Sequence, residues 1–173
     1  MKKRTTMLAL LLATGAGTCL QAQEKLTQFK VRDAITVRTP IMNDSINPKG
    51  EKYADKDLLK TPVVLDLADA PFQVLSTDTA GVLSFPKAEK DHSIYLLETS
   101  LRAERFMTGK LKVTSPARWE IFINGESKMS KENAEDSISG ASTREVNLRL
   151  EPEADYEITI KLLSGSKDKA VPT

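Results

Sequence analysis

The chain offers few side chains for acid–base or nucleophilic chemistry. His92 is the only histidine and Cys19 the only cysteine among 173 residues. A hydrolase that used His92 as a base would also need a nucleophile, and the sequence contains no G-x-S-x-G motif. A zinc site needs several nitrogen or sulfur ligands, which one histidine cannot supply. His92 follows Asp91 in a charged connection, so we interpret it as a surface histidine.

Paired carboxylates could support glycosidase-type chemistry. Three groups are candidates: Glu89 and Asp91; Glu132, Glu135 and Asp136; and Glu151, Glu153 and Asp155. All lie in polar turn sequence, which does not imply the burial that tunes the pKa of a catalytic acid, so we interpret them as solvated. Loop oxygens of Asp66, Asp69 or Asp78 could bind calcium, but no calcium-loop spacing accompanies them.

Trp119, the only tryptophan, is the remaining candidate, because an exposed indole can stack on a sugar ring. It alternates with Ile121 and Ile123, which favours the core-facing side of a strand. The dipeptide Asn124-Gly125 follows and favours a type I′ hairpin turn. The sequence therefore assigns no catalytic, cofactor-binding or metal-binding residue, leaves the ligand-binding residues unknown, and predicts no cofactor.

Short alternating segments dominate the rest of the chain. In Arg144–Leu150 and Tyr156–Leu163 every second residue is apolar, whereas the contiguous apolar residues of Ser93–Leu101 predict a strand buried on both faces. Further short strands are expected at Val63–Leu67, Phe72–Leu75, Val82–Phe85 and Lys110–Thr114, and one or two helical turns in Glu51–Lys60. Glu126–Thr143 is expected to be a long polar loop with one helical turn near Lys131–Asp136. The pattern predicts an all-β fold, an antiparallel β-sandwich of jelly-roll type.

The amino terminus predicts export. Lys2, Lys3 and Arg4 precede the apolar stretch Met7–Leu12, and Leu20-Gln21-Ala22 offers a cleavage site. We expect residues 1–22 to be a cleaved signal peptide, too short to span a membrane, which places the protein in the periplasm or outside the cell. Cys19 lacks the residues that precede an acylated cysteine, so lipidation is not expected. Residues 23–62 would form an extension with short strands and turns, 63–164 the sandwich and 165–173 a linker-like tail.

Composition then limits the partners. Cleavage would remove the three basic residues Lys2, Lys3 and Arg4 from 25, against 24 acidic residues, so the net charge becomes about −2. It would also leave no cysteine, hence no disulfide, in a domain of about 150 residues that can still bury a core. Without basic clusters, no nucleic-acid partner is expected, and no transmembrane segment remains after cleavage.

Two long runs carry a family resemblance. Arg105–Glu126 (RFMTGKLKVTSPARWEIFINGE) and Arg144–Leu163 (REVNLRLEPEADYEITIKLL) resemble galactose-binding-like β-sandwich modules, which accompany catalytic domains in secreted bacterial enzymes. The match covers roughly residues 93–164. More loosely, the mature segment looks like the amino-terminal region of exported prolyl-oligopeptidase-like serine peptidases. The resemblance implies an accessory module and transfers no site residue.

Four functions therefore remain open. The first is a non-catalytic module that contacts a glycan or docks on a catalytic domain or other partner, through loops that include Lys131–Thr143. The second is the amino-terminal part of a larger secreted hydrolase, a peptidase or glycosidase, whose active site lies elsewhere. The third is a structural or surface-assembly protein. The fourth, catalysis by this chain itself, is the least supported by its residues.

Overall fold

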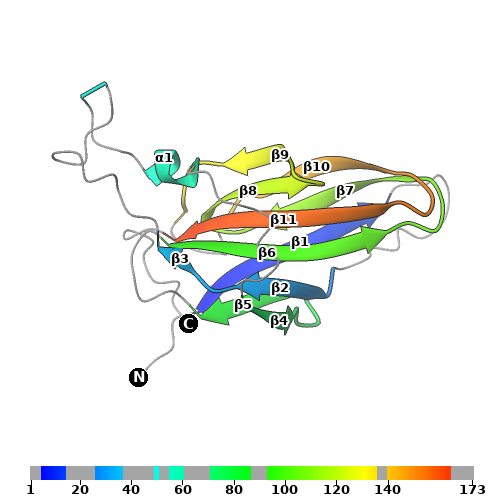
Figure 1. The fold of residues 1–173 in the computed structure, drawn as a ribbon, viewed down its shortest axis with the longest axis horizontal. Coiled ribbons are helices and arrows are strands. Elements are labelled where there is room, and N and C mark those ends of the chain that lie inside the picture. The colour runs from blue at the N-terminus through cyan, green and yellow to red at the C-terminus, as the bar shows by residue number, and fades with distance from the viewer. Residues whose placement is uncertain are drawn as a thin grey trace.

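The computed structural model describes residues 5–14, 26–36, 49–50, 55–60, 71–86, 93–135 and 140–164. These residues form two antiparallel sheets packed face to face (Figure 1). The prediction of an all-β antiparallel sandwich is confirmed. Val63–Leu67, His92 and the tail lie outside the described residues.

The larger sheet has seven strands, and its long central pair is β6 (Ser93–Arg102) and β11 (Asp155–Ser164). Its order is β4 (Phe72–Ser76), β2 (Gln28–Arg32), β6, β11, β8 (Arg118–Ile123) and β9 (Glu126–Lys131), with the short β3 (Ile35–Thr36) also paired to β6. Residues of the expected amino-terminal extension are thus hydrogen-bonded into this sheet through β2 and β3.

The smaller sheet has the order β10 (Thr143–Leu150), β7 (Met107–Thr114), β1 (Thr5–Thr14) and β5 (Val82–Pro86). The first half of β1 pairs with β5 and its second half with β7, antiparallel in both cases. The apolar stretch Met7–Leu12, predicted to be the centre of an export signal, is therefore part of a sheet strand.

Several connections carry the chain between the sheets. Among them, residues 77–81 lead from β4 to β5, residues 103–106 from β6 to β7, residues 115–117 from β7 to β8, and residues 151–154 from β10 to β11. The predicted hairpin turn is confirmed: Asn124 and Gly125 have φ angles of 50° and 76° and join β8 to β9. The prediction of a loop that starts at Glu126 is wrong, because Glu126–Lys131 is strand β9. No helical turn is present at residues 131–135, and residues 136–139 lie outside the described part.

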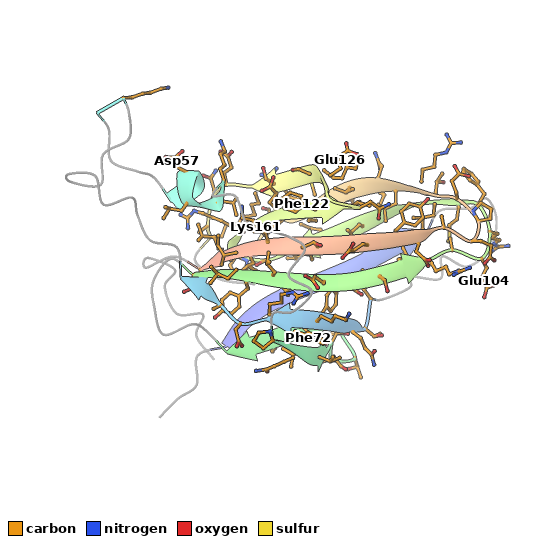
Figure 2. The ribbon with its side chains drawn as sticks, in the orientation of Figure 1. Asp57, Phe72, Glu104, Phe122, Glu126 and Lys161 are labelled. Atoms are coloured by element: carbon orange, nitrogen blue, oxygen red, sulfur yellow. The ribbon has the colours of Figure 1, made fainter. Side chains whose placement is uncertain are left out.

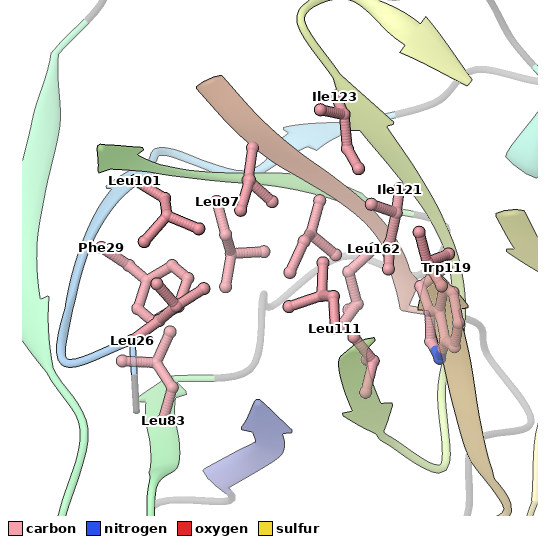
Figure 3. Packing of buried hydrophobic residues seen from close by; sticks show 14 of the residues in the cluster. Leu26, Phe29, Leu83, Leu97, Leu101, Leu111, Trp119, Ile121, Ile123 and Leu162 are labelled. Atoms are coloured by element: carbon pink, nitrogen blue, oxygen red, sulfur yellow. The ribbon is translucent and has the colours of Figure 1, made fainter. Parts of the chain in front are cut away.

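Side chains from both sheets meet in one core (Figure 3). Trp119 is fully buried there, next to Ile121 and Leu162, so its predicted core position is confirmed. Its indole nitrogen has no hydrogen-bond partner. A residue with this environment cannot serve as a sugar platform.

A second, smaller apolar cluster lies on the outer face of the seven-stranded sheet. Leu58 and Leu59 of helix α1 (Asp55–Leu59) pack there with Ile94, Leu96 and Leu163. Both leucines are buried, but they cover the outside of the sheet and are not part of the central core. The same cluster explains why β6 is buried on both faces, as its contiguous apolar residues predicted.

Candidate functional site

A groove of about 950 Å³ lies beside the carboxyl-terminal half of β6, Glu98–Arg102. It forms where β2 and β6 separate: the two strands pair only at Lys30–Glu98 and Val31–Leu97, while β2 continues to pair with β4. Parts of β2, β4, β6 and β11 and the β8–β9 turn line it. The groove is therefore built on sheet strands and one tight turn, which hold their side chains in fixed positions.

The lining combines hydrogen-bonding groups with a few apolar surfaces. Its exposed polar residues are Thr27, Gln28, Lys30, Ser100, Arg102, Asn124, Asp155 and Glu157. Val74 and the half-buried Tyr156 add apolar surface. Such a set can donate and accept hydrogen bonds along a polar ligand while it packs against the ligand's apolar parts.

Asn124 is fixed at the edge of the groove by the backbone of β11. Its backbone N–H donates to the Glu157 carbonyl at 2.8 Å, and its side-chain oxygen accepts from the Glu157 N–H at 2.8 Å. The residue that the sequence identified only as a turn former therefore also joins the turn to the neighbouring strand.

A buried ion pair forms the inner border of the groove. Arg32 donates from Nε to Glu98 Oε1 at 3.0 Å and from Nη2 to Oε2 at 3.1 Å, and both residues are 8% exposed. A bidentate pair of this kind is rigid and directional. Because both oxygens of Glu98 are engaged by Arg32, this carboxylate links β2 to β6 and is poorly suited to proton transfer.

Lys161 is a second buried charge on the same face, outside the groove. Its Nζ lies 4.0 Å from Glu120 Oε2, and Ser127 donates to the other oxygen of Glu120 at 2.7 Å. Burial lowers the pKa of Lys161, and the negative charge of Glu120 opposes part of that effect. A desolvated amine can act as a nucleophile or base, but this one does not line the groove.

The loop expected to contribute to binding is tied down elsewhere. Lys131, 2% exposed, donates to the Ser115 carbonyl and to Glu135 at 2.6 Å, and Ser142 N–H donates to Glu135. Glu135 N–H in turn donates to the Pro116 carbonyl at 2.8 Å. No described residue between 131 and 143 lines the groove.

Glu135 therefore differs from its sequence-based interpretation. It is half-buried and hydrogen-bonded, not a solvated turn residue. Burial alone would raise its pKa, but the hydrogen bonds from Lys131 and Ser142 and the charge of Lys131 together lower it below the ordinary value.

The other carboxylate candidates differ in their exposure and in their ion pairs. Glu151, Glu153 and Asp155 are exposed, as expected, and form surface ion pairs with Arg149 or Arg102. Glu132 pairs with Lys60 at 3.3 Å. Among the described carboxylates that the sequence analysis named as possible acid–base residues, Asp155 alone lines the groove. The remaining members, Glu89, Asp91 and Asp136, lie outside the described residues.

The calcium candidates also fail to converge in the described part. Asp78 accepts from the Ala80 and Val82 N–H groups at 2.9 and 2.8 Å and so closes the β4–β5 turn. Asp66 and Asp69 lie outside the described residues. Among the residues that were placed, no cluster of acidic, histidine or cysteine side chains could hold a metal ion. No described helix is long and apolar enough to cross a membrane.

An apolar edge adjoins the groove. Phe72 and Val74 on the edge strand β4 are 44% and 59% exposed, and Figure 2 shows Phe72 at this border of the sheet. Lys30 Nζ and Arg32 Cζ lie 5.2 and 5.8 Å from the Phe72 ring centroid. An exposed edge strand with apolar side chains is a surface on which another polypeptide can pair.

Sequence reasoning missed the groove but contained one sign of it. The outward positions of β6 change from Ile94 and Leu96 to Glu98, Ser100 and Arg102 within one strand. That change marks the point on β6 beyond which helix α1 no longer covers the outer face of the sheet. The separation of β2 from β6, which creates the space, has no local signature.

Comparison with known proteins adds no relative. No protein-family model, curated protein or solved structure matches the chain.

Proposed function

We propose that this chain is a non-catalytic binding module of an exported protein and that its groove binds a segment of a glycan. The observation that carries the proposal is the groove itself, with hydrogen-bonding side chains presented by sheet strands. The resemblance of residues 93–164 to galactose-binding-like modules of secreted enzymes supports the same reading, as does the predicted signal peptide.

The chemistry of the lining suits a sugar. Each sugar hydroxyl both donates and accepts hydrogen bonds, and Gln28, Ser100 and Asn124 supply neutral groups that can do the same. Tyr156 and Val74 offer apolar surface for the C–H faces of a ring. A volume of about 950 Å³ lies at the upper end of the range for small-ligand sites and would accommodate more than one sugar unit.

Three carboxylates line the groove, Glu98, Asp155 and Glu157, and the arginine partners of the first two favour binding over hydrolysis. Glu98 has both oxygens on Arg32, and Asp155 lies beside Arg102 at 3.6 Å in an exposed position. Glycoside hydrolysis needs one carboxyl that stays protonated and a second that stays ionised across the scissile bond. Both of these carboxylates are engaged by arginine side chains.

Calorimetry of the purified chain against a panel of soluble polysaccharides tests the proposal. Ser100→Trp should block the groove and lower the affinity for any bound glycan at least about tenfold. Thr108→Trp, on the exposed outer face of the other sheet, is the matched control and should bind like the wild type. If no polysaccharide binds, or if both variants bind equally well, the glycan proposal is wrong.

The exposed β4 edge supports a second candidate, docking on a catalytic domain. In that case the chain would be the amino-terminal part of a larger secreted hydrolase, as the looser resemblance implies. Reading the coding sequence beyond Thr173 tests this directly. A continuing frame with a Ser-His-Asp set would support it, and Phe72→Ser with Val74→Ser should then abolish association of the separately purified parts. An immediate stop codon would refute it.

A further inference from the structure

The position of β1 links the predicted export step to the integrity of the smaller sheet. Thr5–Ala9 pairs with Val82–Pro86 of β5, and Ala9–Thr14 pairs with Gly109–Thr114 of β7. β5 is the edge strand of this sheet, and β1 is its neighbour within the sheet (Figure 1). Yet the same ten residues lie inside the segment that the sequence predicts to be cleaved.

Removal of residues 1–22 would leave two strand edges unpaired. The inner edge of β7 and the whole of β5 would lose their partner among the described strands. Unpaired backbone N–H and C=O groups on an apolar sheet attract another strand. The gap would open beside the core, since Leu83, Leu111 and Val113 on the two flanking strands are all fully buried.

We propose that the space between β5 and β7 is a strand-acceptor site, which in the exported protein takes one extended segment from a partner polypeptide. We call it the strand site, defined by residues 82–86 and 109–114. The inference rests on the export that is part of the proposed function. It concerns a different surface from the groove, because no residue of the strand site lines the groove.

The register defines the chemistry of the partner. Leu8, Leu10 and Leu12 pair with Leu83, Val113 and Leu111, so alternate positions of the incoming strand lie opposite buried residues. The segment must be about ten residues long, antiparallel to both neighbours and apolar at every second position, because strand addition obtains affinity from backbone hydrogen bonds and specificity from alternate side chains. Proline is excluded wherever its missing N–H would be needed.

A cleavable form of the full chain tests the inference. A specific protease site is inserted between Ala22 and Gln23, and the protein is made by cell-free synthesis without membranes, so that no signal peptidase acts. After cutting, we expect the amino-terminal fragment to remain bound during gel filtration. Excess synthetic peptide of residues 5–14 should displace it and should keep the thermal unfolding midpoint at the value of the uncut chain. The same peptide with serine at positions 8, 10 and 12 should bind at least about a hundredfold more weakly.

Two results would overturn the strand site. In the first, the fragment leaves at once, and the remaining chain unfolds at the same temperature as the uncut protein and ignores both peptides. In the second, the cut chain aggregates and the residue 5–14 peptide does not prevent it. Aggregation that this peptide suppresses and the serine peptide does not suppress would support the site.

Export is checked separately, by amino-terminal sequencing of the protein recovered from outside the cytoplasm. A start at Gln23 together with no peptide binding would refute the strand site and leave the proposed function intact. An uncleaved amino terminus together with peptide binding would refute the processing step. It would also refute the binding of a partner strand, because β1 would then remain in its own sheet.

Discussion

The outer faces of the two sheets hold their charges in opposite ways. On the four-stranded sheet, Lys110 and Lys112 flank Glu145 at 2.8 and 3.1 Å, and all three side chains are at least a third exposed. On the seven-stranded sheet, Arg32 and Glu98 are joined by two hydrogen bonds and are almost removed from water. Lys161 is buried on the same face.

The difference indicates that the outer face of the seven-stranded sheet carries more than solvated ion pairs. A sandwich needs only one buried face on each sheet, and an exposed face with scattered ion pairs is the ordinary outcome. The seven-stranded sheet goes further: α1 covers one end of its outer face, while the groove opens at the other. Figure 2 shows Asp57 of α1 and Glu104, in the β6–β7 connection, at these opposite ends. The Arg32–Glu98 pair lies between them, and Glu98 is also a wall of the groove.

Removal of Glu98 is expected to give the largest effect. Glu98→Leu leaves the Arg32 guanidinium buried without its carboxylate, which should cost about 3–5 kcal/mol in the free energy of unfolding. Urea denaturation measures it. The double variant Arg32→Met with Glu98→Leu should recover most of the loss, because neither charge of the buried pair remains. If Glu98→Leu alone unfolds at the wild-type midpoint, the two outer faces do not differ as described.

Lys131 offers a similar test on the loop that follows β9. Lys131→Met removes the charged hydrogen bonds to Ser115 and Glu135, and should destabilise the protein by about 2 kcal/mol. Hydrogen exchange should also become faster at the Glu135 amide, which is bonded to Pro116. Lys128→Met, on the same strand with a more exposed side chain, is the control. Equal effects of both variants would show that burial of Lys131 contributes nothing.

The sequence predicted the strands in which every second residue is apolar and faces the core. It missed β9, which is stabilised by a turn and by hydrogen bonds. Val146, Leu148 and Leu150 alternate and are buried, so β10 was predicted correctly. In β9 the only large apolar residue is Met129. This strand forms because the Asn124–Gly125 turn aligns it with β8, and because Lys131 hydrogen-bonds inward at its end. A period-two hydrophobic pattern cannot reveal such a strand.

The candidate site was harder to predict, because it depends on contacts between distant residues. Arg32 and Glu98 are 66 residues apart, and neither has a neighbour in sequence that indicates the pairing. The groove depends on where β2 leaves β6, which is a property of the sheet. The sequence singled out Asn124 for its role in the turn and Asp155 as a solvated carboxylate, and neither interpretation indicated a groove.

The pH dependence of stability should distinguish Glu135 from the solvated carboxylates. Its pKa is lower in the folded protein than in the unfolded chain. Such a group stabilises the fold fully above the unfolded pKa, near 4.3, and this contribution is lost as the pH falls through the lower folded pKa. Glu135→Gln should therefore be less stable than the wild type by up to about 1 kcal/mol at pH 6. The difference should shrink toward zero below pH 4 in urea titrations. A difference that is constant with pH would contradict the assigned ion pair.

Glu145 should show the smallest effect and so complete the comparison between the two faces. Hydrogen bonds from Lys110 and Lys112 lower its pKa, but the group is exposed, and water and salt screen its charge. We expect Glu145→Gln to leave the urea midpoint unchanged at physiological salt, because water replaces the lost partners of both lysines. Any stabilisation by the wild-type carboxylate should appear only at low salt and only above its pKa. If Glu145→Gln instead destabilised the protein as strongly as Glu98→Leu, the exposed ion pairs would be as important as the buried one, and burial would no longer explain the difference between the faces.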